Sequence, residues 1–240
     1  MLNSYPIQHI LFLDIETVPQ KQRFDQLPEE WKALWEIKSG YLLKNRDGET
    51  PESIYERAGI YAEFGKIICI SCGVLHGQKN DRRLTVKSFA GDDEKQVLEH
   101  FCTMLNKWSA NEPRYLCAHN GKEFDFPYLC RRLIIQGLPI PPLLNTAGKK
   151  PWEVNHLDTM ELWKFGDFKS YTSLNLLAHT LSLPTPKDDI DGSMVAKIYY
   201  EEKNLPRIVT YCQKDVITLA RIFLRFCGEG SLPDDWIEIK

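Results

Sequence analysis

The sequence has 240 residues, of which 43% are hydrophobic and 26% are charged. These proportions are typical of a folded globular protein and exclude disordered, collagen-like and coiled-coil chains. Thirty basic and 33 acidic residues give a net charge of -3, so no global positive field exists to hold a polyanion. Any nucleic-acid site must be local, and we expect a single domain spanning residues 1–240.

No apolar run approaches the roughly 20 residues that a membrane-spanning helix needs, so we expect a cytoplasmic protein without membrane contact. The seven cysteines are an odd number scattered among apolar segments, which favours reduced thiols over a disulfide framework. Cys69 and Cys72 form a C-x-x-C pair, but in a strand their side chains point to opposite faces. We interpret them as core cysteines rather than half of a zinc site.

The first half of the chain predicts mainly strands. Residues 7–17 are mostly apolar and end in acids, which indicates a central strand with a polar end. Residues 65–77 and 82–91 are strand-like and are joined by a charged turn, so we expect a hairpin. Apolar residues then recur at helical spacing over 92–108, with Asp93 as the capping residue.

The second half predicts mainly helices. A short strand is expected at 114–120, followed by a helix at 124–138 with Pro127 in its first turn and Gly137 at its end. A stretch with four prolines follows and indicates a loop. Later helices are expected at 173–183, 193–204 and 205–226. This order predicts an α/β sheet covered by helices.

Residues 19–60 interrupt the order between the first two strands. They contain Trp31 and Trp35 in a helix-like stretch, then a charged break and a second helix start at Thr50-Pro51. We interpret this segment as an insertion. Two alternatives stay open: a helical pair packed on the sheet edge, or a flap over the active site.

Asp14 and Glu16 stand two residues apart at the end of the first expected strand, so both carboxylates point to the same face. Two adjacent anions repel, and a hard cation such as Mg²⁺ or Mn²⁺ would offset that repulsion. The pair alone is also compatible with a solvated strand end.

Two further groups of polar residues carry the same ambiguity. Asp125 follows a short strand and begins a helix, where it could simply complement the helix dipole, and Asn120 could be an ordinary turn former. Tyr211 and Asp215 are four apart on the last expected helix and share one face beside its apolar stripe. Each group taken alone is more typical of structure than of catalysis.

Together, DIET at 14–17, HNGKEFDFP at 119–127 and Y-x-x-x-D at 211–215 occur in an order that resembles the DEDD superfamily of 3'→5' exonucleases. The chain resembles more closely the predicted exonuclease family related to the proofreading domain of family-B DNA polymerases. Tyr211, four residues before the last acid, resembles the tyrosine branch of that superfamily. We assign no base role to His119, which precedes the second motif, and expect a hydrogen-bonded structural histidine.

The resemblance implies a ribonuclease-H-like fold, with a mixed sheet of about five strands flanked by helices and the carboxylates gathered at one sheet edge. It also implies two divalent cations, Mg²⁺ or Mn²⁺, held by carboxylates. The catalytic and metal-binding residues that it implies are Asp14, Glu16, Asp125 and Asp215, with Tyr211 orienting the attacking water.

The substrate implied is the 3' end of DNA, above all single-stranded DNA, with a separate polymerase as a candidate partner. Thr17, Asn120 and Phe124 match family positions near the terminal nucleotide. Two other functions stay open: an exoribonuclease of the same branch, and an inactive module that binds nucleic-acid ends. The four acids disfavour the inactive module, because a binding-only protein has no need of converging anions.

Overall fold

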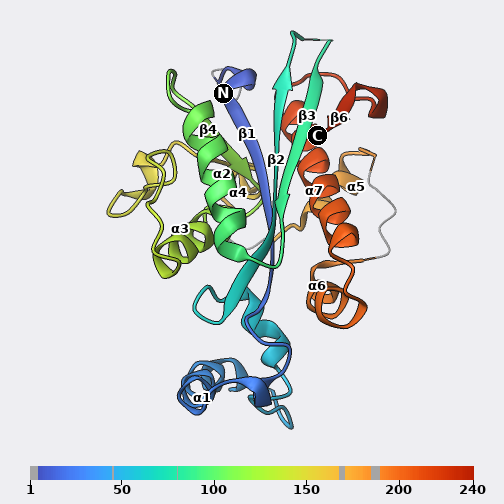
Figure 1. The fold of residues 1–240 in the computed structure, drawn as a ribbon. Helices are drawn as coiled ribbons and strands as arrows, with labels where there is room; N and C mark the ends of the chain where they lie inside the picture. Colours follow the sequence, from blue (N-terminus) through green and yellow to red (C-terminus); the bar gives the residue numbers. More distant parts are fainter. Residues whose placement is uncertain (1–4, 45, 80, 168–170, 185–189) are drawn as a thin grey trace.

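The computed structural model describes residues 5–44, 46–79, 81–167, 171–184 and 190–240. Among these residues, one sheet has six strands in the order β5-β4-β1-β2-β3-β6 (Figure 1). The strands are β1 (Ile10–Pro19), β2 (Gly65–His76), β3 (Arg83–Ala90), β4 (Tyr115–Ala118), β5 (Leu157–Asp158) and β6 (Ile237–Ile239). The pairs β1/β2 and β2/β3 are antiparallel, and the other three pairs are parallel.

The expected α/β sheet flanked by helices is confirmed. The helices are α1 (Glu29–Leu43), α2 (Glu94–Trp108), α3 (Asp125–Ile135), α4 (Thr159–Lys164), α5 (Leu174–Thr180), α6 (Val195–Lys197) and α7 (Leu205–Phe226). The sheet has one strand more than the resemblance implied, because β6 adds a short edge strand beside β3.

Alternation along β1 divides the core into two layers. Leu11, Leu13 and Ile15 pack with α2 and α3, whereas Ile10 and Phe12 pack with α7 on the opposite face. Figure 1 shows α2 and α3 on one side of the sheet and α7 on the other. Asp14 and Glu16 continue the second series, so the alternation itself points them toward α7.

Several local signals act as expected. The Asp93 side chain caps α2 by accepting from the Gln96 N–H at 3.2 Å. Gly137, at a φ of 68°, ends α3 in the left-handed conformation that glycine adopts without strain. The helix expected at 193–204 is instead irregular, with α6 running into a π-helical turn at Ile198–Glu202. α4, within the region least covered by the resemblance, had no sequence prediction.

Residues 20–64 form a lobe beyond the end of β1 and β2, at the bottom of Figure 1. The Gln20 N–H donates to the Phe64 carbonyl at 2.9 Å and closes the neck of the lobe. Inside it, Trp35 is fully buried against Tyr55 and Phe64. The helical insertion is therefore confirmed, but it has a core of its own.

The second helix predicted for the insertion does not form. The second helix start at Thr50 forms a turn, in which Thr50 and Ser53 exchange side-chain to backbone hydrogen bonds, and a 3-10 helix follows at Tyr55–Ile60. Of the helical pair considered as one alternative, α1 packs on the aromatic residues of its own lobe, whereas the 3-10 helix at Tyr55–Ile60 packs against β1 and β2. A flap over the site stays a prediction.

A buried ion pair fixes the lobe to the body. The Arg132 guanidinium on α3 donates twice to the Glu94 carboxylate on α2, and it also donates to the Ala62 carbonyl of the lobe at 2.7 Å. Both charged side chains are almost fully buried. Removing one partner of such a pair leaves an unpaired charge in the core, which typically costs about 3–5 kcal/mol.

Candidate active site

β1 supplies the first two acids from the middle of the sheet. β1 continues to Pro19, so Asp14 and Glu16 lie within a central strand. The sequence had predicted a strand end, and the resemblance had implied a sheet edge. The site opens there because β4 pairs with β1 only as far as Phe12. A β-bulge in the β1/β2 ladder next to Glu16 bends the strands at the same place.

α7 crosses this part of β1 and brings three further polar side chains. The Cys212 thiol donates to Asp14 Oδ2 at 3.3 Å, across 198 positions of the chain. The possible ligand atoms of Asp14, Glu16 and Cys212 all lie within 4.8 Å of one another. Cys212 and Val216 are fully buried in the apolar stripe, and Tyr211 and Asp215 flank it half-buried, as the sequence predicted.

Asp125 reaches the same place from the start of α3. Its carboxylate accepts a hydrogen bond from the Ile15 backbone N–H of β1, beyond the point at which β4 stops pairing with that strand. Only 4% of its surface is exposed. The turn before it is tight, since a Cβ on Gly121 would collide with the Ala118 side chain.

We call Asp14, Glu16, Asp125 and Asp215 the acid cluster. Burial raises the pKa of Asp14 well above its usual range, and three carboxylates raise it further: Glu16, Asp215 and Asp125. Burial likewise raises the pKa of Glu16, followed by the charge of Asp215. The pKa of Asp125 rises to about 7, mainly through burial, with the nearby carboxylates of Asp158 and Asp215 adding to it.

The raised pKa values of the acids on β1 and α3 have no counterpart in a nearby basic side chain. Among the described residues, no lysine or arginine contributes to the pKa values of Asp14, Glu16 and Asp125. Clustered carboxylate oxygens are the donor set that suits Mg²⁺ or Mn²⁺. The residues present therefore fit a divalent-metal site.

The Tyr211 hydroxyl hydrogen-bonds the Asp215 carboxylate one helical turn away. Burial raises the pKa of Tyr211 above its usual value, and the neighbouring charges of Asp215, Glu16 and Asp14 raise it further. The side chain is therefore a neutral phenol at physiological pH, able to donate one hydrogen bond and to accept others.

The remaining sequence-predicted residues lie close in sequence to members of the acid cluster. Thr17 is half-buried on β1, with its hydroxyl against that of Tyr128. Asn120 adopts a positive φ of 66° in the turn before Asp125. Phe124 is half-buried and packs on Tyr128, with ring centroids 5.3 Å apart. The structural role expected of His119 is confirmed by hydrogen bonds of 2.8 Å to the Thr159 hydroxyl and the Thr172 carbonyl.

Sequence reasoning missed Asp158, which holds the turn that carries Asp125. Its buried carboxylate accepts from the backbone N–H groups of Asn120, Lys122, Met160 and Glu161. It thereby joins the 118–125 turn to the start of α4. An aspartate followed three residues later by a glutamate is a helix-start pattern, so the sequence carried a local signal for the cap of α4. No sequence pattern indicated the hydrogen bonds from Asp158 to the distant turn.

Cys212 and Cys69 were also missed as neighbours of the acids. The expected core role of Cys69 and Cys72 is confirmed, since both are buried, and all seven cysteines are free thiols. Cys69 nevertheless lies opposite Glu16 on β2, and it contributes to the raised pKa of the Cys212 thiol. Only the pairing register of β1 and β2 reveals this.

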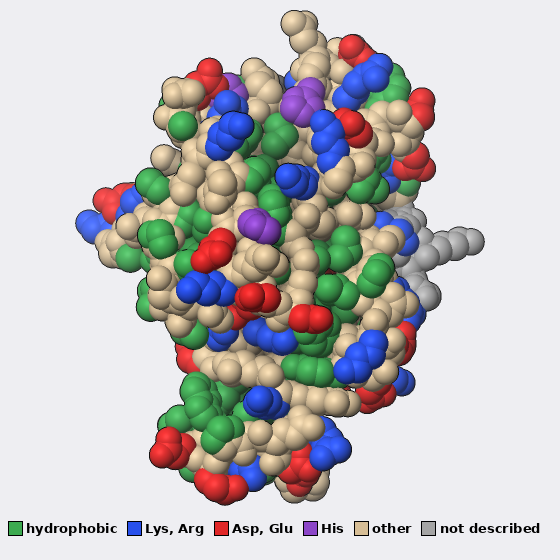
Figure 2. Space-filling view, viewed as in Figure 1, with side chains coloured by type: hydrophobic (Ala, Val, Ile, Leu, Met, Phe, Trp, Pro, Cys, Tyr) green, Lys and Arg blue, Asp and Glu red, His purple; other side chains and the backbone are tan. Residues whose placement is uncertain are grey.

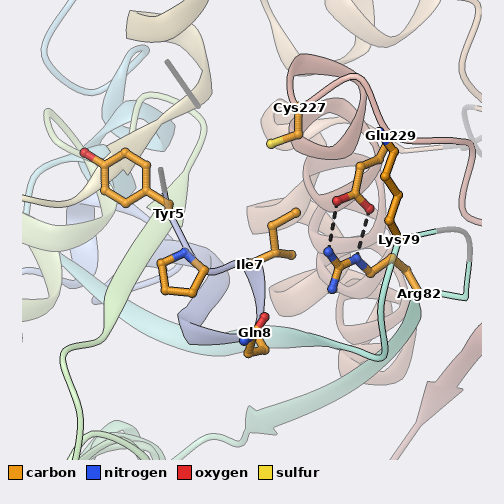
Figure 3. A pocket seen from close by; sticks show the side chains of 8 residues that line it. Tyr5, Ile7, Gln8, Lys79, Arg82, Cys227 and Glu229 are labelled. Atoms are coloured by element: carbon orange, nitrogen blue, oxygen red, sulfur yellow. Dashed lines mark hydrogen bonds and ion pairs between the residues drawn. The ribbon is translucent and has the colours of Figure 1, made fainter. Parts of the chain in front are cut away.

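A pocket of about 250 Å³ lies elsewhere, between the segment before β1, the β2/β3 turn and the end of α7 (Figure 3). Arg82 and Glu229 line it and form a two-bonded ion pair at 2.9 Å, which neutralises the charge of the arginine. None of the acid cluster lines this pocket. In the described parts of the chain, no helix combines the length and apolar character needed to cross a bilayer.

The chain is similar in sequence to a family of predicted exonucleases and to a DNA polymerase. Residues 60–235 match the family model described as a predicted 3'-5' exonuclease related to the exonuclease domain of PolB. Over 135 residues the chain is 22% identical to a DNA polymerase of Pyrococcus glycovorans, an alignment that covers 51% of this chain and 17% of the polymerase. The chain thus spans a small part of that relative.

Among solved structures, the chain is similar to the family B DNA polymerase from the hyperthermophilic archaeon Pyrobaculum calidifontis. The TM-score is 0.52 and the sequence identity 16%, over 90% of this chain and 24% of that chain. This likeness confirms the expected ribonuclease-H-like fold.

Proposed function

The chain belongs to the family of predicted 3'-5' exonucleases related to the exonuclease domain of family-B DNA polymerases, and from this premise we propose that it removes nucleotides from the 3' end of DNA. The proposed reaction is metal-dependent phosphodiester hydrolysis. The whole chain, residues 1–240, would act as one exonuclease domain with the lobe as its insertion.

One observation carries the proposal: carboxyl groups from β1, α3 and α7 lie within each other's electrostatic field in a mostly buried site. Burying several carboxyl groups side by side destabilises a fold, so a protein that needed them only for packing would be more stable with apolar residues there. A bound pair of cations would convert this repulsion into attraction.

By resemblance, Asp14 would contact both cations, Glu16 and Asp215 would complete the one beside the attacking water, and Asp125 would hold the other. Two such ions supply stabilisation of both the attacking and the leaving oxygen in an in-line displacement. The Cys212 thiol, by donating to Asp14 Oδ2, would orient that carboxylate. The Asp125 carboxylate is oriented in the same way by the Ile15 N–H.

Tyr211 would position the attacking water. Its hydroxyl donates to Asp215, which leaves the oxygen lone pairs free to accept a hydrogen bond from a water molecule. Because its raised pKa keeps Tyr211 as the neutral phenol, no phenolate is present to take the proton of the water, which would pass to bulk solvent instead. Its role would be orientation of the water rather than proton removal.

Thr17, Asn120 and Phe124 lie close in sequence to members of the acid cluster and would contact the terminal nucleotide. The net charge of -3 provides no extended track, so contacts would be limited to the last few nucleotides. We propose a polymerase as a candidate partner.

The test uses single strands of DNA and of RNA, each labelled at either the 5' or the 3' end, with Mg²⁺, Mn²⁺ or EDTA. We expect a 5'-labelled DNA strand to shorten one nucleotide at a time with metal and to stay intact with EDTA. Asp14→Ala and Asp215→Ala should abolish the shortening, whereas Glu99→Ala, at an exposed acid on α2, should not.

Each other outcome has a distinct meaning. Shortening of RNA in preference to DNA would replace the proposed substrate by RNA. Binding of 3' ends without cleavage under every metal condition would overturn the enzyme and leave an end-binding module. Release of nucleotides from the 5' end would contradict the proposed direction.

A further inference from the structure

α1 has two apolar faces, and the lobe covers only one of them. Trp35 on the inner face is fully buried, whereas Leu34, Ile37 and Tyr41 are 51%, 67% and 71% exposed. Figure 2 shows hydrophobic side chains gathered on this part of the lower lobe. Contiguous exposed apolar surface of this kind typically marks an interaction site.

The exposed residues follow the spacing of a helix-pairing seam. We define the outer face of α1 as the residues Ala33, Leu34, Ile37, Gly40 and Tyr41. All five are exposed, and positions 33, 37 and 40 repeat at the four- and three-residue steps with which two helices interlock. The outer face therefore has the geometry to receive another helix.

Gly40 supports the same conclusion. Glycine in the middle of a helix costs roughly 1 kcal/mol relative to alanine. A Cβ at Gly40 would meet nothing within 4 Å, so packing within this chain does not require a glycine there. A second helix approaching closely at Gly40 and Ala33 would make use of the small side chains.

The residues at the two ends of the seam are complementary to each other in charge. Glu30 lies seven positions before Ile37 and Lys44 seven positions after it, and both are exposed on the same stripe. In an antiparallel pair centred on Ile37, Glu30 of each copy lies opposite Lys44 of the other. A parallel pair would instead place like charges together.

We propose that the outer face of α1 is the interface of a homodimer, in which two copies pair their α1 helices in antiparallel orientation about Ile37. In this register Tyr41 lies opposite Ala33 of the second copy, and Gly40 lies opposite Leu34 of the second copy, so each large side chain faces a small one. Opposed helix dipoles add a small favourable contribution. The occupant is therefore a second copy of this chain.

The interface is small, which sets the expected affinity. One face of a 15-residue helix buries less than the roughly 1,200–2,000 Å² of a standard stable interface. We therefore expect a reversible dimer with a dissociation constant on the order of micromolar to tens of micromolar. Dimerisation is independent of the proposed nuclease activity.

The experiment is sedimentation velocity of the full chain over about 1 to 200 µM, with light scattering as a second measure of mass. We expect wild type to shift from monomer to dimer across this range. Ile37→Glu should remain monomeric at every concentration. The matched control is Ile134→Glu, which changes an equally exposed isoleucine on α3 and should dimerise like wild type.

Charge reversal tests the orientation. Glu30→Lys and Lys44→Glu alone should each weaken the dimer about tenfold, and the double variant should restore it, because an antiparallel pair then has both charges exchanged. Circular dichroism of each variant shows that α1 remains folded. A wild-type monomer at 200 µM, or a dimer indifferent to Ile37→Glu, would overturn the proposal.

Alternative occupants give their own results. If wild type is monomeric and Ile37→Glu lowers its affinity for a single-stranded oligonucleotide, the outer face binds nucleic acid and the homodimer is wrong. Strand shortening by the monomeric Ile37→Glu variant would leave the proposed function intact whatever the outcome for the dimer.

Discussion

At the acid cluster, carboxyl groups lie mostly inside the protein, whereas on the outer face of α1 leucine, isoleucine and tyrosine lie outside it. Both regions depart from the usual distribution of residues, in opposite directions. In the two proposals made above, cations would stabilise the acids, and a second apolar surface would cover the helix. The difference lies in the cost, because a group of buried carboxylates destabilises a fold far more than an exposed isoleucine does.

The largest expected effect comes from removing an acid at the centre of the cluster. Asp14→Asn should lower the rate of strand shortening by about 1,000-fold or more, which corresponds to about 4 kcal/mol of transition-state stabilisation. The same change should raise the Tm of the metal-free protein, because it removes one of the mutually repelling carboxylates. Single-turnover kinetics and calorimetry measure the two effects, and a lower Tm without metal would contradict this account of the cluster.

Asp158 should matter mainly for stability, through the turn that carries Asp125. Asp158→Ala leaves four backbone N–H groups without their acceptor, so we expect a loss of about 3–5 kcal/mol in the free energy of unfolding. Chemical denaturation measures this loss. Asp158→Asn, which keeps the carbonyl acceptor, is the matched control and should lose less. Equal losses in the two variants would show that the hydrogen bonds to the turn are not what the carboxylate contributes.

The pH dependence of stability tests the burial of the acids. The folded-state pKa of Asp125 is about 7, while an unfolded aspartate has a pKa near 3.9, so between these values the folded chain binds more protons than the unfolded one. Stability of the metal-free chain must then fall as pH rises from about 4 to about 7, by roughly 2–4 kcal/mol. Thermal unfolding at pH 5 and pH 8 in EDTA measures the fall.

Added divalent metal and the Asp125→Asn variant are the controls for thermal unfolding at pH 5 and pH 8. Added Mn²⁺ should restore much of the Tm at pH 8 and have little effect at pH 5, where the carboxyl groups hold protons. Asp125→Asn should flatten the pH dependence. If the metal-free protein instead gains stability from pH 5 to pH 8, the pKa values of these carboxyl groups are not raised in the folded protein.

Tyr211→Phe should produce a smaller, purely kinetic effect. Loss of the hydroxyl removes one contact to the attacking water, so we expect turnover to fall about 10- to 100-fold with strand affinity nearly unchanged. The variant keeps the ring and its packing, so its Tm should stay close to wild type. Fluorescence anisotropy with Ca²⁺ and rapid-quench kinetics separate binding from chemistry, and a loss of binding at normal turnover would contradict the role of Tyr211.

The smallest expected effect lies on the outer face of α1. Gly40→Ala should stabilise the lobe by about 1 kcal/mol in dilute solution, because the helix gains propensity and the added methyl group meets no neighbour. The same methyl group would separate two paired helices and weaken the proposed dimer. Hydrogen exchange of α1 and sedimentation measure these two effects, and a loss of protection in dilute solution would show that Gly40 has a role within the lobe.

The sequence allowed most elements to be predicted because their signals are local. The apolar run before Asp14, the Asp93 cap and the glycine at 137 act within a few positions of the chain. The helix expected at 193–204 is present, but it is irregular, with a π-helical turn at Ile198–Glu202. The helix start expected at Thr50 has its capping hydrogen bonds, but a turn and a 3-10 helix follow in place of an α-helix.

The sequence by itself determined which residues could take part in chemistry, because motif order and the i,i+4 spacing of Tyr211 and Asp215 are properties of the chain alone. Only the tertiary structure decided that Cys212 bonds to Asp14, that Asp158 holds the turn before Asp125, and that one face of α1 stays exposed. These facts depend on strand register and on contacts across as many as 198 positions, for which local periodicity carries no information.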